Sequence, residues 1–124
     1  MARLLRGGLG RNVLIGSGGA DRIYGGGDDN ILIGGTTDFD LNAAALDLVF
    51  AEWSQDTDFD QRVNNIRKGK GLLAGSGFFL DRTTVHDDLA TDLLTAGAGQ
   101  NWYFIDATTA PVVGQKGDDR VTRV

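Results

Sequence analysis

The stretch GGLGRNVLIGSGGADRIYGGGDDNILIGG, residues 7–35, indicates how the chain is built. It holds eleven of the 19 glycines and repeats with a period of nine, as GGLGRNVLI, GSGGADRIY and GGGDDNILI. In each unit glycine opens the turn, Asn or Asp fills the sixth place, and a large apolar residue fills the eighth. Glycine permits the positive φ angles of a tight turn, and the three residues after the turn form a short strand. The stretch therefore predicts alternating turns and strands rather than a flexible linker.

A second, fainter pair of units lies in residues 87–104, which divide as DDLATDLLT and AGAGQNWYF. Asp92 and Asn101 fill the sixth places of these units, and Leu94 and Tyr103 fill the eighth places. The phase matches that of the first stretch, although most of the glycines are gone from the first unit. We therefore expect five strands, three before an insertion and two after it.

The insertion between the two groups of repeats has a helical pattern. Apolar residues recur at helical spacing from Leu41 to Trp53, and Asp40 is placed to cap the N-terminus of that helix. A second helix is expected from Phe59 to Lys68, with Asp58 as its N-cap and Gly69 beyond its end. The segment therefore predicts two helices joined as a hairpin.

The nonapeptides resemble the G-G-x-G-x-D-x-U-x repeats of the RTX calcium-binding family, in which U is a large apolar residue. The order of repeats, helix pair and final strand pair over residues 7–106 is similar to the C-terminal module of large bacterial secreted proteins. The resemblance implies a mainly β fold, a parallel β-roll of the RTX type with an inserted α-helical hairpin. Its expected parts are a nonapeptide roll at 7–35, a helical hairpin at 41–69, a second repeat pair at 87–104 and a tail at 111–124.

Two nonapeptides make one full turn of such a roll, so alternate units are neighbours in one sheet. Strands 13–15 and 31–33 then present only apolar side chains outward, and an exposed patch of that kind needs a cover. The outward residues are Val13, Ile15, Ile31 and Ile33. We expect the helix pair to dock on this face, together with Trp102 and Phe104.

The same alternation separates the sixth-position side chains by chemistry. It places three amides on one edge, at Asn12, Asn30 and Asn101, and two carboxylates on the other, at Asp21 and Asp92. Calcium binds six to eight hard oxygen ligands, and an amide oxygen supplies no charge. The edge with the carboxylates is therefore the better predicted calcium site.

The resemblance implies Ca²⁺ as the bound ion, and we expect one to three ions. The candidate ligands at the carboxylate edge are Asp21, Asp92, Asp38, Asp40 and the carbonyls of Gly19 and Ala20. At the amide edge the candidate ligands are the three asparagines and turn carbonyls, and we expect a weak site there unless Asp28 or Asp29 turns inward. Each assignment has a simpler alternative, because Asn side chains can satisfy their own turns, and these acids can be solvated turn residues or helix caps.

His86, the single histidine, precedes Asp87 and Asp88. A His-Asp-Asp cluster beside calcium can activate water, so a small calcium-dependent hydrolase of esters or phosphoesters is the alternative function. The sequence contains no G-x-S-x-G, His-Glu-x-x-His or P-loop motif that supports an enzyme. A third hypothesis is a metal-free capping or association module, in which the roll edges pair with a second copy or with other domains of a parent protein.

Length and composition limit the class of protein. The chain of 124 residues is expected to form a single domain, 1–124, and the absence of cysteine excludes disulfides and thiolate zinc sites. A net charge of -5 and a pI of about 4.6, with scattered Lys and Arg, predict no nucleic-acid partner. No segment has the apolar run of a membrane span, so no membrane insertion is expected.

Residues 1–6 lack the apolar stretch of a signal peptide. The resemblance implies export by type I secretion, in which a chain stays unfolded in the calcium-poor cytosol and folds outside the cell. We therefore expect a secreted, extracellular module that forms the C-terminal part of a larger bacterial protein. The start at Met1, almost inside the first repeat, fits a piece of a larger polyprotein.

Overall fold

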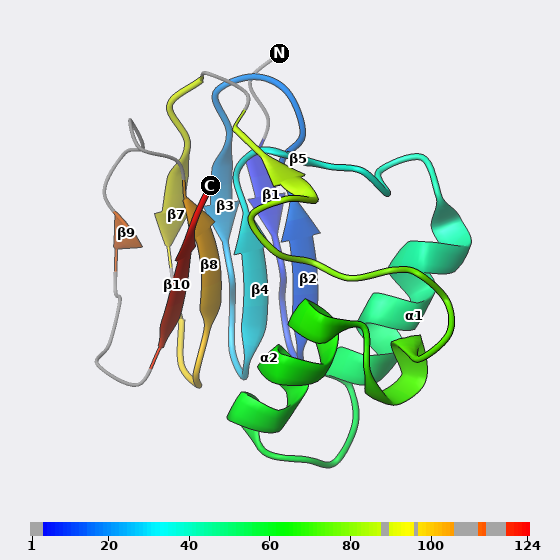
Figure 1. The fold of residues 1–124 in the computed structure, drawn as a ribbon. Helices are drawn as coiled ribbons and strands as arrows, with labels where there is room; N and C mark the ends of the chain where they lie inside the picture. The colour runs from blue at the N-terminus through cyan, green and yellow to red at the C-terminus, as the bar shows by residue number, and fades with distance from the viewer. Residues whose placement is uncertain (1–3, 88–89, 96, 106–111, 114–118) are drawn as a thin grey trace.

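The computed structural model describes residues 4–87, 90–95, 97–105, 112–113 and 119–124. Within these residues the repeats alternate between two four-stranded parallel sheets, which lie face to face (Figure 1). In spatial order, sheet A contains β1 (Leu4–Arg6), β3 (Arg22–Tyr24), β7 (Leu93–Thr95) and β9 (Val112–Val113). Sheet B contains β10 (Arg120–Arg123), β8 (Trp102–Ile105), β4 (Asn30–Ile33) and β2 (Asn12–Ile15).

The period of nine sets the register in both sheets. Eighth-position residues lie opposite one another, as in the pairs Ile23 with Leu94 in sheet A and Leu32 with Tyr103 in sheet B. All five predicted strands are present. The pairing adds β1 before them and β9 and β10 after them, in the same ninefold phase. Two runs of four strands therefore flank the insertion, where the sequence indicated three and two strands.

The space between the two sheets holds only a thin core. Strands β1 to β4, β7, β8 and β10 each send one central side chain inward, and the buried residues of this cluster are Ile23, Leu32, Leu94 and Tyr103. The larger core lies on the outer face of sheet B. It joins the strand residues Ile31, Ile33, Trp102 and Phe104 to the helices, with Val13 and Ile15 packed at its border. The predicted docking of the helix pair on this face is confirmed.

The helices form as the pattern predicts, with one change at the start of the first. α2 (Phe59–Lys68) begins at Asp58, whose side chain accepts from Gln61 N, and ends at Gly69 in the left-handed conformation. α1 (Ala43–Trp53) is capped by Asn42, not by Asp40 as predicted. The cap is displaced because the Asp40 Oδ1 atom accepts hydrogen bonds from the backbone N–H and the hydroxyl of Thr37 instead.

The insertion leaves the repeats and rejoins them at one place. The antiparallel pair β5 (Thr36–Thr37) and β6 (Val85–His86) forms its base, and the 3₁₀ helix η1 (Gly71–Leu73) follows α2. Buried Glu52 of α1 connects the three helices of the insertion, since its two carboxylate oxygens accept from Asn65 Nδ2 in α2 and from Leu72 N in η1. The helices are therefore inserted within a turn of the repeat array, between β4 and β7.

The prediction of a mainly β chain folded as a parallel β-roll is wrong. Two α-helices and η1 form a full layer over sheet B, and an antiparallel strand pair joins them to it, so the structure is mixed α/β (Figure 1). The chain is not a plain roll because the core between the two sheets is thin. That core contains four buried residues, whereas twelve lie in the core between sheet B and the helices. The sequence pattern presents the helices as an insertion, but most of the buried apolar residues lie in the core that they cover.

Candidate metal centre

The sixth-position amides lie together at one edge of the sheets, here called the amide edge and formed by Asn12, Asn30 and Asn101. Asn12 Nδ2 donates to Asn30 Oδ1 at 2.9 Å, and Asn30 Nδ2 donates to Asn101 Oδ1 at 3.1 Å. The backbone N–H of Asn30 also donates to Asn101 Oδ1, at 3.0 Å. The three side chains therefore form a continuous hydrogen-bonded ladder across β2, β4 and β8.

Each amide nitrogen of the ladder also binds carbonyls of its own turn. Asn12 Nδ2 lies 3.1 Å from the Gly10 carbonyl, and Asn30 Nδ2 lies 3.1 Å from the Asp28 carbonyl. Asn101 Nδ2 contacts the Gly99 carbonyl at 3.5 Å. The amide N–H groups thus supply positive partial charge to these turn carbonyls.

Asp119 terminates the ladder beyond β8. Its Oδ1 atom accepts from Asn101 N at 2.8 Å, and its Oδ2 atom accepts from the Tyr103 hydroxyl at 3.4 Å. Burial raises the pKa of Tyr103 well above its ordinary value, and the charge of Asp119 adds to this effect. The phenol therefore stays protonated and available as a donor to the carboxylate.

Asp21 and Asp92 form the opposite edge, here called the acid edge. Both side chains are almost fully buried, and the backbone N–H of Asp21 donates to Asp92 Oδ1 at 2.7 Å. This bond repeats the one from Asn30 N to Asn101 Oδ1. The Oδ1 atom therefore has the same role at both edges, and the edges differ in the second atom of the side chain.

The first glycine of each repeat shows where that second atom lies. A Cβ at Gly7 would lie 2.6 Å from Asn12 Nδ2, and a Cβ at Gly16 would lie 2.6 Å from Asp21 Oδ2. A Cβ at Gly34 would lie 2.5 Å from Asp92 Oδ2. Only glycine fits at these positions. In the acid repeats a carboxylate oxygen thus takes the place that an N–H donor takes in the amide repeats.

This difference tests whether calcium fits each edge. Beside Gly16 the Oδ2 atom of Asp21 and the Gly34 carbonyl oxygen both border the space that a Cβ would fill. A set of carboxylate and carbonyl oxygens suits Ca²⁺, so the acid edge fits the ion. The amide edge does not fit, because N–H groups already bind its turn carbonyls. Within the part of the chain that the structure describes, no three His, Asp or Glu side chains form a metal cluster, so carbonyls would have to complete the ligand set.

Comparison with known families identifies the repeat. The family model for the RTX calcium-binding nonapeptide repeat matches residues 6–38, in four copies. The chain carries RTX calcium-binding nonapeptide repeats. The resemblance stated from the sequence is thereby confirmed for this stretch. No curated protein and no solved structure matches the chain.

The backbone explains the glycines of the RTX repeats and the departures from their pattern. The second and fourth places of the turns adopt positive φ, as at Gly8 and Gly10. Ser17 at a second place has φ 62°, and Asp28 at a fourth place has φ 61°. These two residues keep the turn conformation although a Cβ is unfavourable there. Gly19, with φ 100°, and Ala20 lie directly before Asp21 in the acid-edge turn.

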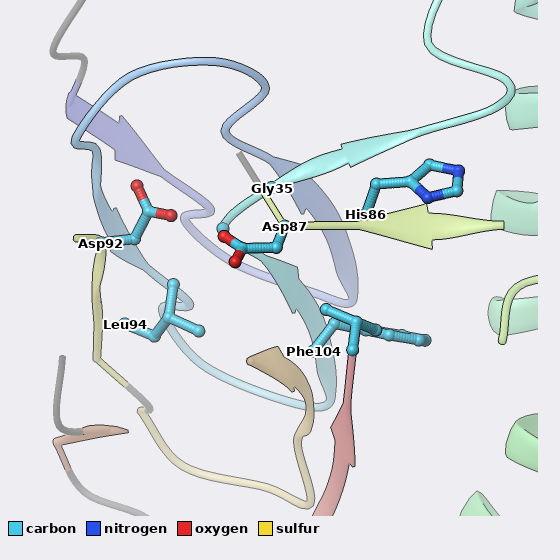
Figure 2. A pocket seen from close by; sticks show the side chains of 8 residues that line it. Gly35, His86, Asp87, Asp92, Leu94 and Phe104 are labelled. Carbon is cyan, nitrogen blue, oxygen red and sulfur yellow. The ribbon is translucent and has the colours of Figure 1, made fainter. Parts of the chain in front are cut away.

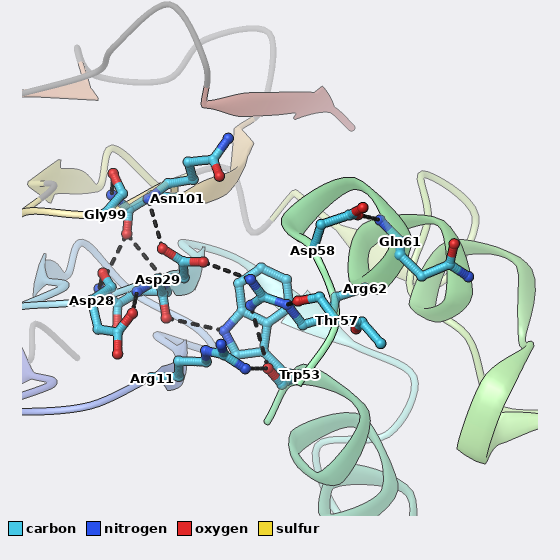
Figure 3. Close-up of polar contacts among 12 residues, drawn as sticks. Arg11, Asp28, Asp29, Trp53, Thr57, Asp58, Gln61, Arg62, Gly99 and Asn101 are labelled. Atoms are coloured by element: carbon cyan, nitrogen blue, oxygen red, sulfur yellow. Dashed lines mark hydrogen bonds and ion pairs between the residues drawn. The ribbon is translucent and has the colours of Figure 1, made fainter. Parts of the chain in front are cut away.

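Asp28 and Asp29, two predicted ligands, have other partners. The Asp28 carboxylate accepts from the N–H of Asp29 and stays at the surface. Asp29 Oδ2 forms a largely buried ion pair with Arg62 at 2.7 Å, and its Oδ1 accepts from Gln100 N at 2.8 Å (Figure 3). Both carboxylate oxygens of Asp29 are engaged, so it connects α2 to the repeats rather than facing a metal.

Asp38 and Asp40, two further predicted ligands, also have other partners. The Asp38 Oδ1 atom pairs with His86 Nε2 at 2.6 Å, and both side chains are about half exposed. The second oxygen of Asp40 accepts from the Ser17 hydroxyl at 3.3 Å. Asp38 thus links the two sides of the insertion's base, and Asp40 ties that base to the neighbouring turn.

Of the His-Asp-Asp cluster in the hydrolase hypothesis, the structure describes His86 and Asp87, and their side chains do not converge (Figure 2). Figure 2 shows the carboxylate of Asp87 turned away from the ring of His86. Both residues line a cavity of about 10 Å³, which is the room that one water molecule needs. Asp88 lies outside the described residues. The geometry therefore gives no support to hydrolysis at this position.

Sequence reasoning missed two functional positions. Arg62 was predicted only as part of a helix, yet it lies over the Trp53 ring at 4.7 Å and pairs with Asp29 (Figure 3). Asp119 was assigned to an undefined tail. Its signal is present in GQKGDDRVT, residues 114–122, where Gly114, Gly117, Asp119 and Val121 fill the first, fourth, sixth and eighth places of a further repeat.

Proposed function

We propose that the chain is a calcium-binding module that folds when Ca²⁺ binds at its acid edge. Asp21 and Asp92 would hold the ion, together with turn carbonyls of residues such as Gly19, Ala20 and Gly34. The observation that carries this proposal concerns the sixth position of the repeat. Its side chain places a carboxylate oxygen beside the first glycine in the acid repeats, where the amide repeats have an amide nitrogen. An amide nitrogen brings hydrogens to the turn carbonyls, whereas an ionised carboxylate brings only negative charge.

The energetics of the acid edge favour folding on binding. Burying two carboxylates beside carbonyl oxygens opposes the folded state unless a cation or protons neutralise them. Calcium that binds only the folded chain adds its binding free energy to folding. The amide edge needs no ion by the same reasoning, so we propose that the metal requirement of the whole array resides in Asp21 and Asp92.

The RTX repeats also support a cellular context. We propose that the chain belongs to a bacterial protein exported by type I secretion and folds in external calcium, as the family resemblance implies. Among the described residues, no helix has the length and apolar character needed to cross a bilayer. The secreted location is part of this proposal.

Calcium titration of folding tests the proposal directly. Far-UV circular dichroism in chelator and then in rising Ca²⁺, with Mg²⁺ as the control ion, is expected to show folding with calcium alone. The double variant Asp21→Asn with Asp92→Asn makes the acid edge resemble the amide edge, so it should fold in chelator. Asp56→Asn, at an exposed acid, is the matched control and should keep the calcium requirement.

Two outcomes would overturn the parts of this proposal separately. A wild-type chain as folded and stable in chelator as in calcium would exclude calcium-driven folding. A double variant that still requires calcium would leave calcium-driven folding intact and would exclude the acid edge as its site.

A further inference from the structure

The two edge strands of sheet B differ in charge. β2 and β10 lie at opposite ends of this sheet in the described part of the chain (Figure 1). β2 reads Asn-Val-Leu-Ile and carries no charge, whereas β10 reads Arg-Val-Thr-Arg. An uncharged apolar edge strand is a template for pairing with another strand, and charged side chains usually prevent such pairing.

A groove beside β10 concentrates positive charge on this acidic protein. The arginines that line it are Arg67, Arg82, Arg120 and Arg123. Arg120 reaches the exposed carboxylate of Asp60 at 3.6 Å, and the other three form no ion pair within the described ranges. Asp81 also lines the groove, but its Oδ1 atom accepts from the N–H and hydroxyl of Thr83. The groove therefore offers guanidinium groups to an acidic partner.

A groove beside β2 has the opposite character. Val13 and Ile15 of the strand line it together with Leu46, Asp47 and Phe50 of α1. Phe50 is 46% exposed. Asp47 forms no ion pair among the residues that the structure places. The surface thus combines apolar area with an available carboxylate, on the face of sheet B that carries the helices.

The amide ladder has a direction that begins at β2 and runs toward β10. The N–H of Asn30 donates to Asn101 Oδ1, and that of Asn101 donates to Asp119 Oδ1. In this direction Asn12 is the first member. Its Nδ2 donates inward to Asn30, and no donor from the described residues reaches its Oδ1. A parallel strand placed beside β2 would supply a backbone N–H to this oxygen.

We propose that copies of this chain associate head to tail, with the β10 edge of one copy added in parallel to the β2 edge of the next. Every strand pair within sheet B is parallel, so this contact continues the sheet, its register and its ladder. It also brings the arginine groove of one copy to Asp47 of the other on the same face. The contact is heterologous and does not close, so it produces chains of copies rather than a fixed dimer. It is independent of where calcium binds.

Sedimentation velocity in saturating calcium, over a range of protein and salt concentrations, tests this association. The wild-type mass should rise with protein concentration and fall with salt, because the contact depends on exposed charges. Asp47→Lys and Arg123→Glu should each weaken association by about tenfold or more. An equimolar mixture of the two variants should recover it, because every unlike contact then pairs opposite charges.

Val13→Lys, which places a charge on the edge strand, should also abolish association, with circular dichroism as the check on folding. A wild-type chain that stays monomeric at all concentrations would overturn the proposal, and the arginines would then only protect the β10 edge. A mass that stops at the dimer and does not respond to Arg123→Glu would overturn it too, because this result indicates pairing of β2 with β2.

Discussion

Replacing Asn30 with Asp tests most directly why the amide edge and the acid edge behave differently. Asn30 is fully buried at the centre of the ladder, and its Nδ2 donates to Asn101 Oδ1 and to the Asp28 carbonyl, both at 3.1 Å. The carboxylate of Asn30→Asp still accepts from Asn12, but it has no N–H for these two acceptors. The variant therefore turns an amide repeat into an acid repeat without changing its shape.

The expected cost follows from these contacts. Two lost neutral hydrogen bonds cost about 2 kcal/mol, and a buried carboxylate oxygen facing acceptors adds about 1–3 kcal/mol. We therefore expect the free energy of unfolding to fall by about 3–5 kcal/mol, at a calcium concentration where the wild-type chain is just folded. Calcium should then reverse the loss, because the new carboxylate and the turn carbonyls form an oxygen-only ligand set.

Urea unfolding followed by tryptophan fluorescence, repeated over a series of calcium concentrations, measures both effects. One additional bound ion should make the variant gain about 1.4 kcal/mol more than the wild type for each tenfold rise in calcium. Asn64→Asp makes the same chemical change at an exposed position of α2 and should alter neither quantity much. A loss below about 1 kcal/mol would refute the role given to the amide N–H groups. An unchanged calcium slope would refute the claim that a carboxylate at this position creates an ion site.

Two further predictions concern the turns and the attachment of the helices. Ser17→Gly should be more stable than Ser17→Ala by about 1 kcal/mol in thermal or urea unfolding, because both variants lose the hydroxyl but only alanine keeps a Cβ at φ 62°; equal stabilities would contradict the strain assigned to this turn. Arg62→Ala should lower the free energy of unfolding in saturating calcium by about 3–5 kcal/mol, because it leaves Asp29 largely buried without its cation. Adding Asp29→Ala should recover part of that loss, and strictly additive losses would show that the ion pair contributes nothing as a pair.

The grouping of side chains at the candidate site could be predicted from the sequence as far as the repeat extends. Successive repeats alternate between the two sheets, so alternate sixth-position side chains lie at the same edge. The position of each repeat in the series was therefore enough to group Asn12 with Asn30 and Asp21 with Asp92. The roles of Asp29 and Asp38 could not be predicted this way. Their partners, Arg62 and His86, come from the insertion, and a period within the repeats carries no information about side chains outside them.

The sequence by itself determined the local structure of this protein. Glycine spacing set the turns, the eighth-position residues set the strand register, and Asp58 and Gly69 set the ends of α2. Only the tertiary structure decided that the chain is mixed α/β. One inward side chain per strand buries too little surface between the sheets, so the main core had to form beneath the helices. Local patterns specify short elements, but the depth of a core depends on contacts between residues far apart in the chain.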